Sequence, residues 1–394
     1  MPSERRRILY VQPNSEVGGS DIALLRMVEA LDPKRFDPVV VLPAEGPLAP
    51  MLRAAGATVR LLPMMQLRTL PSPVYQSRYL ARLLPTVRRL AALIREERAE
   101  LVHTNSLYCL YGGFAARLAG CPHLWHVREI PPAIPIARPA LGRMVLGLSR
   151  MVVCMTQACA NELFGPRAGD RRIRLLSEGL DLSEWSRTKV SRSIRQELGI
   201  APGVPVIGFV ARLDPWKGLD VFIDAASRIA AEFPEAVFLV SGDAPTGFEA
   251  YRQNMEARAT ALGLGDRIRF LGWRYRLGDI PALMADLDVF CHTSIAPEPF
   301  GLVIIEAMAM GCPVIAARAG GPVEIVEDGV SGLLTRPGDA VALAAAIRDL
   351  LIDRDRRNRL AVAGRARVET VYSRAAFGTQ LRALSEEALA GTLA

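Results

Sequence analysis

The sequence has 394 residues, 50% of them hydrophobic and 23% charged, which excludes a wholly disordered chain and allows large buried cores. Its length predicts two or three domains. The net charge is +7, and Lys occurs only at positions 34, 189 and 217 among 48 Lys and Arg. An Arg-rich surface suits phosphate groups or membrane headgroups, although a biased genome composition would give the same excess of Arg.

The six cysteines include no C-x-x-C pair, and most stand among apolar residues. This pattern predicts reduced, buried thiols and a cytoplasmic protein. The N-terminal apolar run is too short for a signal peptide. No stretch reaches about 18 uninterrupted apolar residues, so no membrane-spanning helix is expected.

The first half of the chain alternates short apolar strands with helices. Helices are predicted at residues 21–31 and near 48–55, and strands at 8–11, 38–42, 59–62, 101–103, 124–127 and 151–154. Asp21 falls in the first turn of the first helix, where a carboxylate favours the positive end of the helix dipole. Such alternation is typical of a doubly wound parallel sheet.

A second α/β unit is predicted at residues 205–372, with strands at 206–210, 236–241, 268–271, 289–292, 314–317 and 332–335. The first domain is expected to span residues 1–184, and the polar segment 185–204 to form a linker. Residues 373–394 are expected to form a C-terminal helix that packs on the first domain. Ligands of open α/β sheets bind at the carboxyl ends of the strands, so these halves are expected to face a central cleft.

Two segments of the second half carry the candidate chemistry. In G-F-V-A-R-L-D-P-W-K-G, Arg212 and Lys217 follow a strand and precede a helix, which suits a diphosphate site, although they could be a solvated turn pair. In E-P-F-G-L-V-I-I-E, Glu298 follows another strand and Glu306 lies about two turns further on. Carboxylates are strong acceptors for sugar hydroxyls. Free amides at the start of the helix after Gly301 favour anions.

These residues, with the G-G-P turn at 320–322, closely resemble the motifs of the GT-B glycosyltransferases of family four. The likeness covers nearly the whole chain. It implies an α/β fold of two Rossmann-like domains and a retaining transferase that moves a hexose from a UDP- or GDP-linked sugar. It also implies that no cofactor and no catalytic metal are needed, and that the acceptor is a glycan, a lipid-linked group or a small molecule.

The resemblance gives each matching residue a role. Arg212 and Lys217 would hold the donor diphosphate, Glu298 the donor sugar, and Glu306 the ribose hydroxyls. Backbone amides that would help to hold sugar and phosphate are those of Phe300, Gly301 and Leu302.

Further matches lie in the first half. Gly18 and Gly19 match the family's Gly-Gly loop, which can approach the donor closely because it has no side chains. His126, in W-H-V-R-E, matches the family's active-site histidine and would contact the donor sugar near the reacting carbon. His103 could line the acceptor side, but a structural role is favoured, and His123 and His292 carry no assigned role.

Three details depart from the family pattern or stay open. Glu178 stands where the family often has Asn, so no donor contact is assigned to it. Asp286 and Asp288 resemble a metal-binding D-x-D motif, but their place between a helix and a buried strand favours a cap or turn. Trp273 and Arg274 are candidates for the base pocket.

Residues 75–98 combine regularly spaced Arg with Leu and Ile, which predicts a basic amphipathic helix interrupted at Pro85. We expect an ordinary surface helix or a contact with an anionic membrane surface. In the second case the protein would be peripheral at the inner face of the membrane, where a lipid-linked acceptor would stand.

Other functions remain as alternatives. A sugar-nucleotide epimerase or hydrolase of the same fold, or a catalytically silent scaffold that binds a sugar nucleotide, would keep the donor motifs. An NAD-linked oxidoreductase is disfavoured because no G-x-G-x-x-G follows the first strand. Nucleic acid is not an expected partner.

Overall fold

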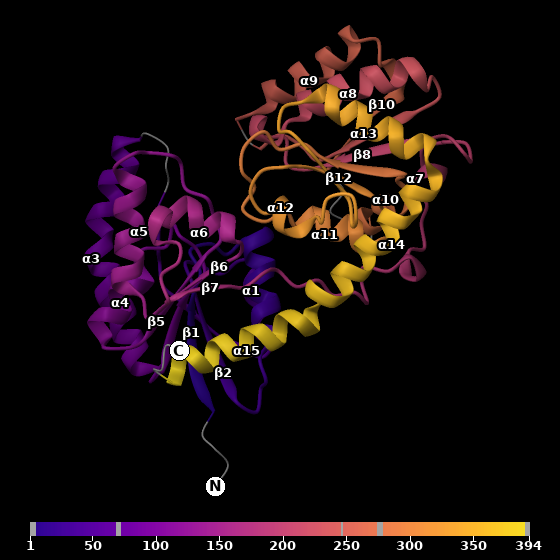
Figure 1. The fold of residues 1–394 in the computed structure, drawn as a ribbon. Helices are drawn as coiled ribbons and strands as arrows, with labels where there is room; N and C mark the ends of the chain where they lie inside the picture. Colours follow the sequence, from indigo (N-terminus) through magenta and orange to yellow (C-terminus); the bar gives the residue numbers. More distant parts are fainter. Residues whose placement is uncertain (1–4, 68–71, 246, 274–278, 391–394) are drawn as a thin grey trace. The chain divides into compact units, whose positions relative to one another are not determined.

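A computed structural model describes residues 5–67, 72–245, 247–273 and 279–390 (Figure 1). The chain divides into a first unit, residues 1–179 with 374–394, and a second unit, residues 180–373. Each unit contains one parallel sheet with helices on both faces, as the strand and helix alternation predicted.

The first sheet has seven strands in the order β3-β2-β1-β4-β5-β6-β7. All of its neighbouring strands are parallel. The strands are β1 Arg6–Val11, β2 Phe36–Leu42, β3 Thr58–Leu61, β4 Leu101–Thr104, β5 His123–Val127, β6 Met151–Cys154 and β7 Ile173–Leu175. The last strand was not predicted, because only three residues of mixed polarity form it at the sheet edge.

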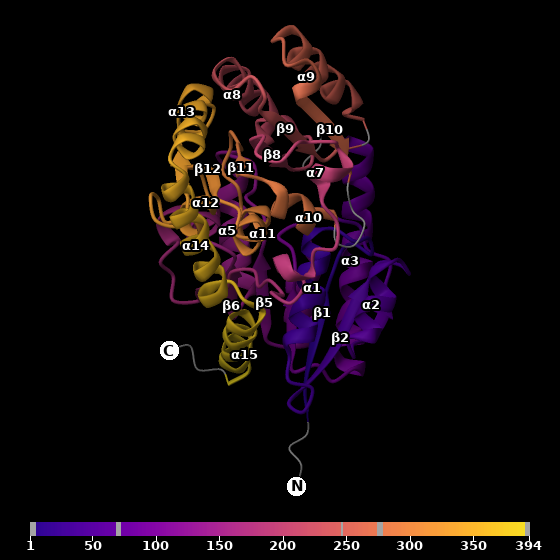
Figure 2. The ribbon, with the colours of Figure 1, turned by 90° about the vertical axis from the view of Figure 1, so that its right-hand side faces the viewer.

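Helices cover the two faces of this sheet in two groups (Figures 1 and 2). One group consists of α1 Gly19–Ala30, α2 Leu48–Ala54 and α15 Arg374–Ala390, which share a core with β1 and β2. The other consists of α3 Pro73–Glu96, α4 Tyr111–Ala119, α5 Ala137–Leu148 and α6 Gln157–Phe164. The predicted interruption at Pro85 is wrong, because α3 runs through that residue with Pro85 exposed on its outer side.

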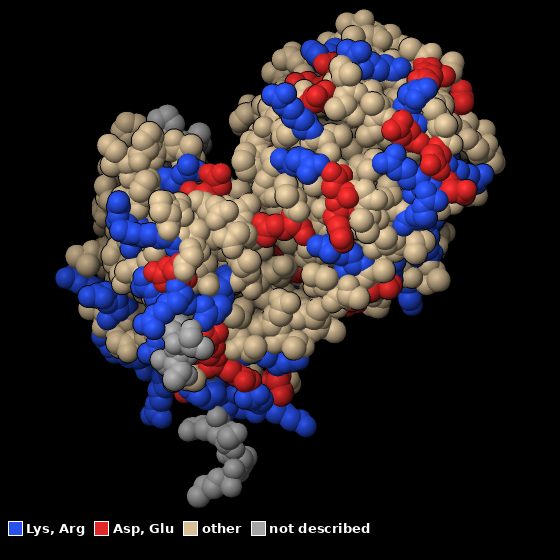
Figure 3. All heavy atoms as spheres, viewed as in Figure 1, with Lys and Arg blue, Asp and Glu red and all other residues tan. Residues whose placement is uncertain are grey.

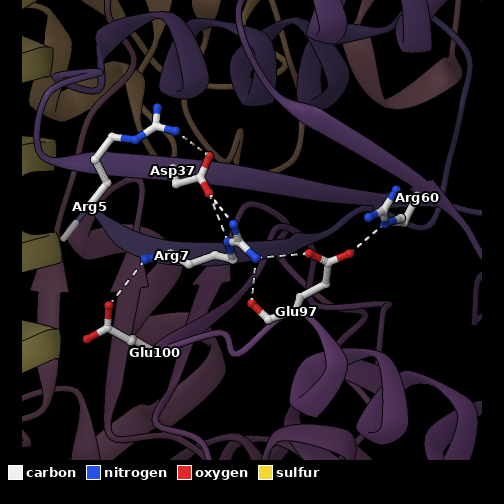
Figure 4. Close-up of polar contacts among 6 residues, drawn as sticks. All are labelled: Arg5, Arg7, Asp37, Arg60, Glu97 and Glu100. Carbon is white, nitrogen blue, oxygen red and sulfur yellow. Dashed lines mark hydrogen bonds and ion pairs between the residues drawn. The ribbon is translucent and has the colours of Figure 1, made fainter.

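An ionic network joins the first three strands (Figure 4). The Arg7 guanidinium donates to Asp37 at 2.8 Å and to the Glu97 carbonyl at 2.9 Å. The buried Glu97 carboxylate also accepts from Arg60 at 2.5 Å. These contacts link β1, β2 and β3 to the end of α3 and involve none of the candidate ligand residues, so we assign them a structural role.

The second sheet has six strands in the order β10-β9-β8-β11-β12-β13, again with parallel neighbours. They are β8 Val206–Val210, β9 Val237–Ser241, β10 Ile268–Gly272, β11 Val289–His292, β12 Val314–Ala317 and β13 Leu333–Thr335. One face is covered by α8 Leu219–Glu232, α9 Glu249–Ala261 and α13 Ala340–Ile352, and the other mainly by α10 Asp279–Asp286, α11 Leu302–Ala309 and α14 Arg354–Val371 (Figure 2). Short helices include η3 Pro215–Lys217, α7 Ile194–Glu197 and α12 Pro322–Ile325.

Residues 185–204, expected as a linker, lie in the second unit. Arg195 binds the Asp286 carbonyl at 2.8 Å and the Asp288 carboxylate at 2.6 Å. The Asp286 carboxylate accepts from the Ser193 hydroxyl at 2.9 Å. Both aspartates thus fasten this segment to the sheet. No helix among the described residues combines the length and the apolar character needed to cross a bilayer.

Candidate active site

The two candidate segments of the second unit meet because β8 and β11 are neighbours at the centre of the sheet. The strand order reverses direction at this point, because β9 and β10 lie on one side of β8 whereas β11, β12 and β13 lie on the other. Such a switch in strand order leaves a crevice at the carboxyl ends of open α/β sheets. The loop with Arg212 and Lys217 follows β8, and the loop with Glu298 follows β11.

The centre of this site is a buried group of charged and polar side chains from both loops. The Lys217 ammonium lies 2.5 Å from Glu298 Oε2 and 4.1 Å from the centre of the Trp216 ring. The same carboxylate oxygen lies 3.3 Å from His292 Nε2 and 3.1 Å from the Ser294 hydroxyl. Glu298 is 9% exposed, so its charge is held by these contacts rather than by bulk water.

The surroundings of Glu298 keep it ionised. Burial alone raises the pKa of this carboxyl, but the hydrogen bond from His292 and the nearby Lys217 ammonium outweigh burial, and the pKa falls to about 2. Glu298 is therefore an anion at neutral pH. An ionised carboxylate accepts hydrogen bonds from hydroxyl groups strongly.

Glycines allow the loops to approach closely. Gly218 has φ +69°, and a Cβ there would lie 2.1 Å from the Thr293 carbonyl oxygen. Gly320 has φ +76°, and a Cβ there would lie 2.3 Å from the Glu298 carbonyl oxygen. The amide of Gly321 donates to that carbonyl at 2.7 Å. The G-G-P turn therefore supports the Glu298 backbone rather than only ending a strand.

Helix α11 begins directly beside this group. Gly301, with φ +107°, is its N-cap, and Leu302 is its first residue. The first amides of a helix have no partner within the helix and attract anions. The Phe300 ring is buried against Tyr372 with ring centres 5.9 Å apart, and Glu306 is half-buried on the same helix.

Lys217 and Arg212, which the sequence suggested would converge, point to different partners. Lys217 pairs with Glu298, whereas Arg212 pairs with Asp214 and keeps a side chain that is 57% exposed. Arg212 is thus the more accessible cation of the two. Trp273 is 41% exposed, and Arg274 lies outside the described residues.

In the first unit, three polar rings share one face of the sheet at neighbouring strands. The Tyr10 and His103 ring centres are 4.9 Å apart, and those of His103 and His126 are 5.6 Å apart. All three residues are buried, and neither ring nitrogen of His126 has a hydrogen-bond partner among the described residues. Burial and the nearby Arg128 charge lower the pKa of His126 well below its usual value. Both conditions leave His126 a neutral imidazole.

The Gly18–Gly19 loop is exposed, and the Asp21 carboxylate fixes its backbone by a hydrogen bond. The Gly18 amide donates to Asp21 Oδ2 at 2.9 Å, and Gln12 Nε2 donates to Asp21 Oδ1 at 2.5 Å. Asn105 Nδ2 in turn donates to Gln12 Oε1 at 2.9 Å. This buried chain of side chains links the carboxyl ends of β1 and β4 to the start of α1.

Two other predicted positions have structural partners. The acid at Glu178, where the family often has an amide, is buried and pairs with the buried Arg128 guanidinium. His123, to which no role was assigned, bonds the Thr104 and Ser149 hydroxyls at 2.8 and 3.1 Å, which is a structural role.

Sequence reasoning missed two contributors. His292 was given no role, yet it contacts Glu298; its place at the carboxyl end of a strand, six residues before Glu298, was the available signal. Gln12 was also missed, because its part depends on contacts with Asn105, which is distant in sequence.

Two family models match the chain. The model described as Glycosyltransferase Family 4 covers residues 17–184, and the model described as Glycosyl transferases group 1 covers residues 190–367. The D-inositol 3-phosphate glycosyltransferase of Geodermatophilus obscurus is 31% identical over 77% of this chain and 73% of its own length. The protein of the same name from Nocardia farcinica is 33% identical over 57% of this chain, a match that spans only half of its own length.

Solved structures agree with these matches. Anabaena HepE, crystallised in complex with UDP and glucose, is 29% identical, with a TM-score of 0.80 over 97% of this chain and 100% of that one. A sucrose-phosphate synthase from Thermosynechococcus elongatus, 22% identical, shares the fold with a TM-score of 0.78 over 98% of this chain and 100% of its own. The chain therefore belongs to glycosyltransferase family four and is a glycosyltransferase of the GT-B fold.

Proposed function

We propose that this protein transfers a hexose from UDP-linked sugar to an acceptor hydroxyl with retention of the anomeric configuration. The observation that carries the proposal is the buried group of Lys217, Glu298 and His292 beside the start of α11. It combines a cation for phosphate with an ionised acceptor for sugar hydroxyls.

On the donor side, Lys217 and the amides of Phe300, Gly301 and Leu302 hold the diphosphate and sugar. Arg212, exposed beyond β8, adds a second cation for the diphosphate. Glu298 binds hydroxyls of the sugar, and Glu306 binds those of the ribose. These groups replace the charge that a divalent cation would supply, so transfer should continue in the presence of EDTA.

In the first unit, Gly18 and Gly19 let the backbone approach the donor, and His126 contacts the sugar near the reacting carbon. Because the pKa of His126 is held far below neutrality, it acts as a neutral donor or acceptor of hydrogen bonds. Its titration should therefore produce no step in activity between pH 6 and 8.

The proposed chemistry is attack on the donor face that the leaving group occupies. The bond between the anomeric carbon and the diphosphate oxygen breaks, and the acceptor oxygen bonds to the same carbon. The acceptor proton passes to the leaving diphosphate oxygen, and Arg212 and Lys217 stabilise the charge that develops there.

Relatives support the choice of substrates. HepE was crystallised with UDP and glucose, which favours UDP over the GDP alternative. Two of the most similar curated relatives are named for D-inositol 3-phosphate, and another, LpsE of Rhizobium meliloti, for lipopolysaccharide core biosynthesis. We propose an acceptor that carries polyol or glycan hydroxyls and is either free or lipid-linked. If the acceptor is lipid-linked, the protein would lie at the surface of an anionic membrane.

A thermal-shift screen with UDP, GDP and ADP sugars tests the donor. Stabilisation by UDP-sugars above the others is expected, and a preference for GDP-sugars would replace UDP by GDP. A transfer assay with product configuration read by NMR then tests the reaction. An inverted product would refute retention. Release of free sugar in the presence of acceptors would favour a hydrolase, and formation of an epimerised donor would favour an epimerase. Donor binding without any turnover would favour a silent scaffold.

A further inference from the structure

The segment between β5 and α5 exposes an uncharged, apolar stretch of the first unit. Residues 131–137 read P-P-A-I-P-I-A, and all of them except Pro131 are exposed. The Ile134 side chain is 52% exposed and Ile136 is 84% exposed. Three prolines restrict the backbone, so the segment is not free to collapse and cover its isoleucines. Adjacent exposed apolar side chains with a polar rim mark a site of contact with a membrane or another molecule.

A cationic groove lies directly beside this stretch. It has a volume of about 410 Å³ and lies between the start of α5 and the end of α6. Arg138, Arg143 and Arg167 line it, and Glu162 is its only carboxylate. Glu162 is paired with Arg138 at 2.5 Å, and neither Arg143 nor Arg167 has an acidic partner within the described residues. Two cations therefore remain available at the rim of the groove.

Apolar residues also line the groove. Leu163, Phe164, Pro139 and Pro166 contribute to its walls. Guanidinium groups bind phosphate oxygens through paired hydrogen bonds, and apolar walls suit the first carbons of an acyl chain. A phospholipid headgroup combines these two features.

The neighbouring helices extend the same kind of surface. Helices α3, α4 and α5 lie side by side on one face of the sheet, and Lys and Arg gather on that side of the first unit in Figure 3. Helix α3 exposes Leu80 at 66% and Leu84 at 53% next to Arg82 and Arg88. Basic residues beside exposed apolar side chains are the features by which amphipathic surfaces bind anionic bilayers.

We propose that residues 132–137 insert into the interface of an anionic phospholipid membrane while Arg143 and Arg167 bind lipid phosphates. The stretch begins five residues after Val127, the end of β5, and His126 lies on that strand. An acceptor held in the membrane would thus be presented at the carboxyl edge of the first sheet. Only this last consequence rests on the proposed transferase function; the membrane contact stands without it.

Vesicle co-sedimentation of the full chain tests the proposal. Binding to phosphatidylcholine vesicles that contain phosphatidylglycerol, and not to phosphatidylcholine alone, is expected. The double variant Ile134→Ser with Ile136→Ser should lower the vesicle partition coefficient roughly tenfold or more, because insertion strength scales with the apolar area buried. Arg143→Gln with Arg167→Gln should remove most of the dependence on phosphatidylglycerol.

The matched control replaces two comparably exposed valines of the second unit, Val341→Ser with Val362→Ser. This control should bind as the unaltered chain does. If the isoleucine variant binds unchanged while Leu80→Ser with Leu84→Ser releases the protein, α3 and not this stretch is the docking element, and the proposal is wrong. Absence of binding to any vesicle also overturns it.

A thermal shift with UDP on every variant separates the two proposals. Normal stabilisation by UDP shows that each variant is folded and that its second unit is intact. Vesicle binding without any UDP effect would refute the donor proposal and leave the membrane proposal standing.

Discussion

The carboxyl edges of the two sheets differ in how their buried polar side chains are hydrogen-bonded. In the second unit, Glu298 is buried with a cation, an imidazole and a hydroxyl around it. In the first unit, His126 and His103 are buried with ring nitrogens that have no partner among the described residues. The Glu298 carboxylate is satisfied internally, and of its imidazole partner only Nδ1 of His292 lacks a hydrogen bond within the described residues. In the described part of the chain, both ring nitrogens of His126 lack partners that water or a ligand could supply.

This difference indicates that the Glu298 site is preorganised, whereas the His126 site has hydrogen-bonding groups without a partner in the described part of the chain. Buried polar groups are normally hydrogen-bonded, and each unsatisfied group costs about 1–3 kcal/mol. In the proposed reaction, the second unit would hold the donor with little rearrangement. The first unit keeps unused hydrogen-bonding capacity beside strand ends, which suits a role that begins when substrate arrives.

The largest test of this comparison is Glu298→Gln, which keeps the side-chain shape and removes its charge. Lys217 then loses its buried counter-ion, and we expect kcat/KM to fall by roughly 10²–10³-fold, the usual effect of losing one preorganised electrostatic contact. Steady-state kinetics with the donor measure this. Glu327→Gln, at an exposed glutamate of the second unit, should retain normal activity. Near-normal turnover of the Glu298 variant would show that the buried group is structural.

Gly320→Ala tests whether the turn beneath Glu298 fixes its position. A Cβ there meets the Glu298 carbonyl oxygen at 2.3 Å on a backbone with φ +76°. We expect a loss of about 3 kcal/mol in the free energy of unfolding, from an unfavourable φ and steric overlap together. Urea denaturation measures it.

The matched control for that variant is Gly329→Ala. Gly329 has φ +77°, but a Cβ there meets no atom within 4 Å. It should lose only about 1–2 kcal/mol, the contribution of the backbone conformation alone. Equal losses in the two variants would mean that close approach to Glu298 contributes nothing.

Lowering the pH should destabilise the first unit before it destabilises the second. Burial lowers the pKa of His103 and of His123 to about 3, and that of His126 falls well below its usual value. The unfolded chain therefore takes up protons below about pH 6.5 that the folded first unit does not, so its stability falls as pH falls from 6.5 towards 3. Each such histidine contributes up to about 1.4 kcal/mol per pH unit.

Glu298 has a dependence of the same direction, but in a lower range of pH. Its pKa is lowered to about 2, so its stabilising contribution is present above the unfolded value of 4.5 and is lost as pH falls towards 2. Between pH 6.5 and 4.5 only the first unit should weaken. Urea unfolding of two single-tryptophan variants, one retaining Trp125 and one retaining Trp185, reports the units separately; parallel weakening of both units in this window would contradict the comparison.

The smallest expected effect concerns the Gly18–Gly19 loop. Asp21→Asn keeps the shape but replaces an ionised acceptor, and we expect KM for the donor to rise several-fold, about 1 kcal/mol, with kcat little changed. Glu16→Gln, an exposed neighbour, is the control and should leave KM unaltered. An unchanged KM in the Asp21 variant would show that the hydrogen bonds to Gly18 and Gln12 do not position the loop.

The fold was largely predictable because its signals are local. Short apolar runs between helical segments gave every strand of the second sheet within a residue or so at each end, including β8 and β11. The continuity of α3 through Pro85 was not predictable, since it depends on packing of Tyr79, Val87 and Leu90 against the core. Tertiary packing overrode the local preference against proline.

The sequence by itself determined the family, through R-x4-K, the E-x7-E spacing and the G-G-P turn. Only the tertiary structure decided which side chains act together. Lys217 and Glu298 are 81 residues apart, and they pair because β8 and β11 are adjacent in the sheet. Arg128 and Glu178 likewise turn a departure from the family pattern into a buried ion pair. Spacing along the chain encodes local motifs, whereas the contacts that set charge and protonation depend on the order of the strands.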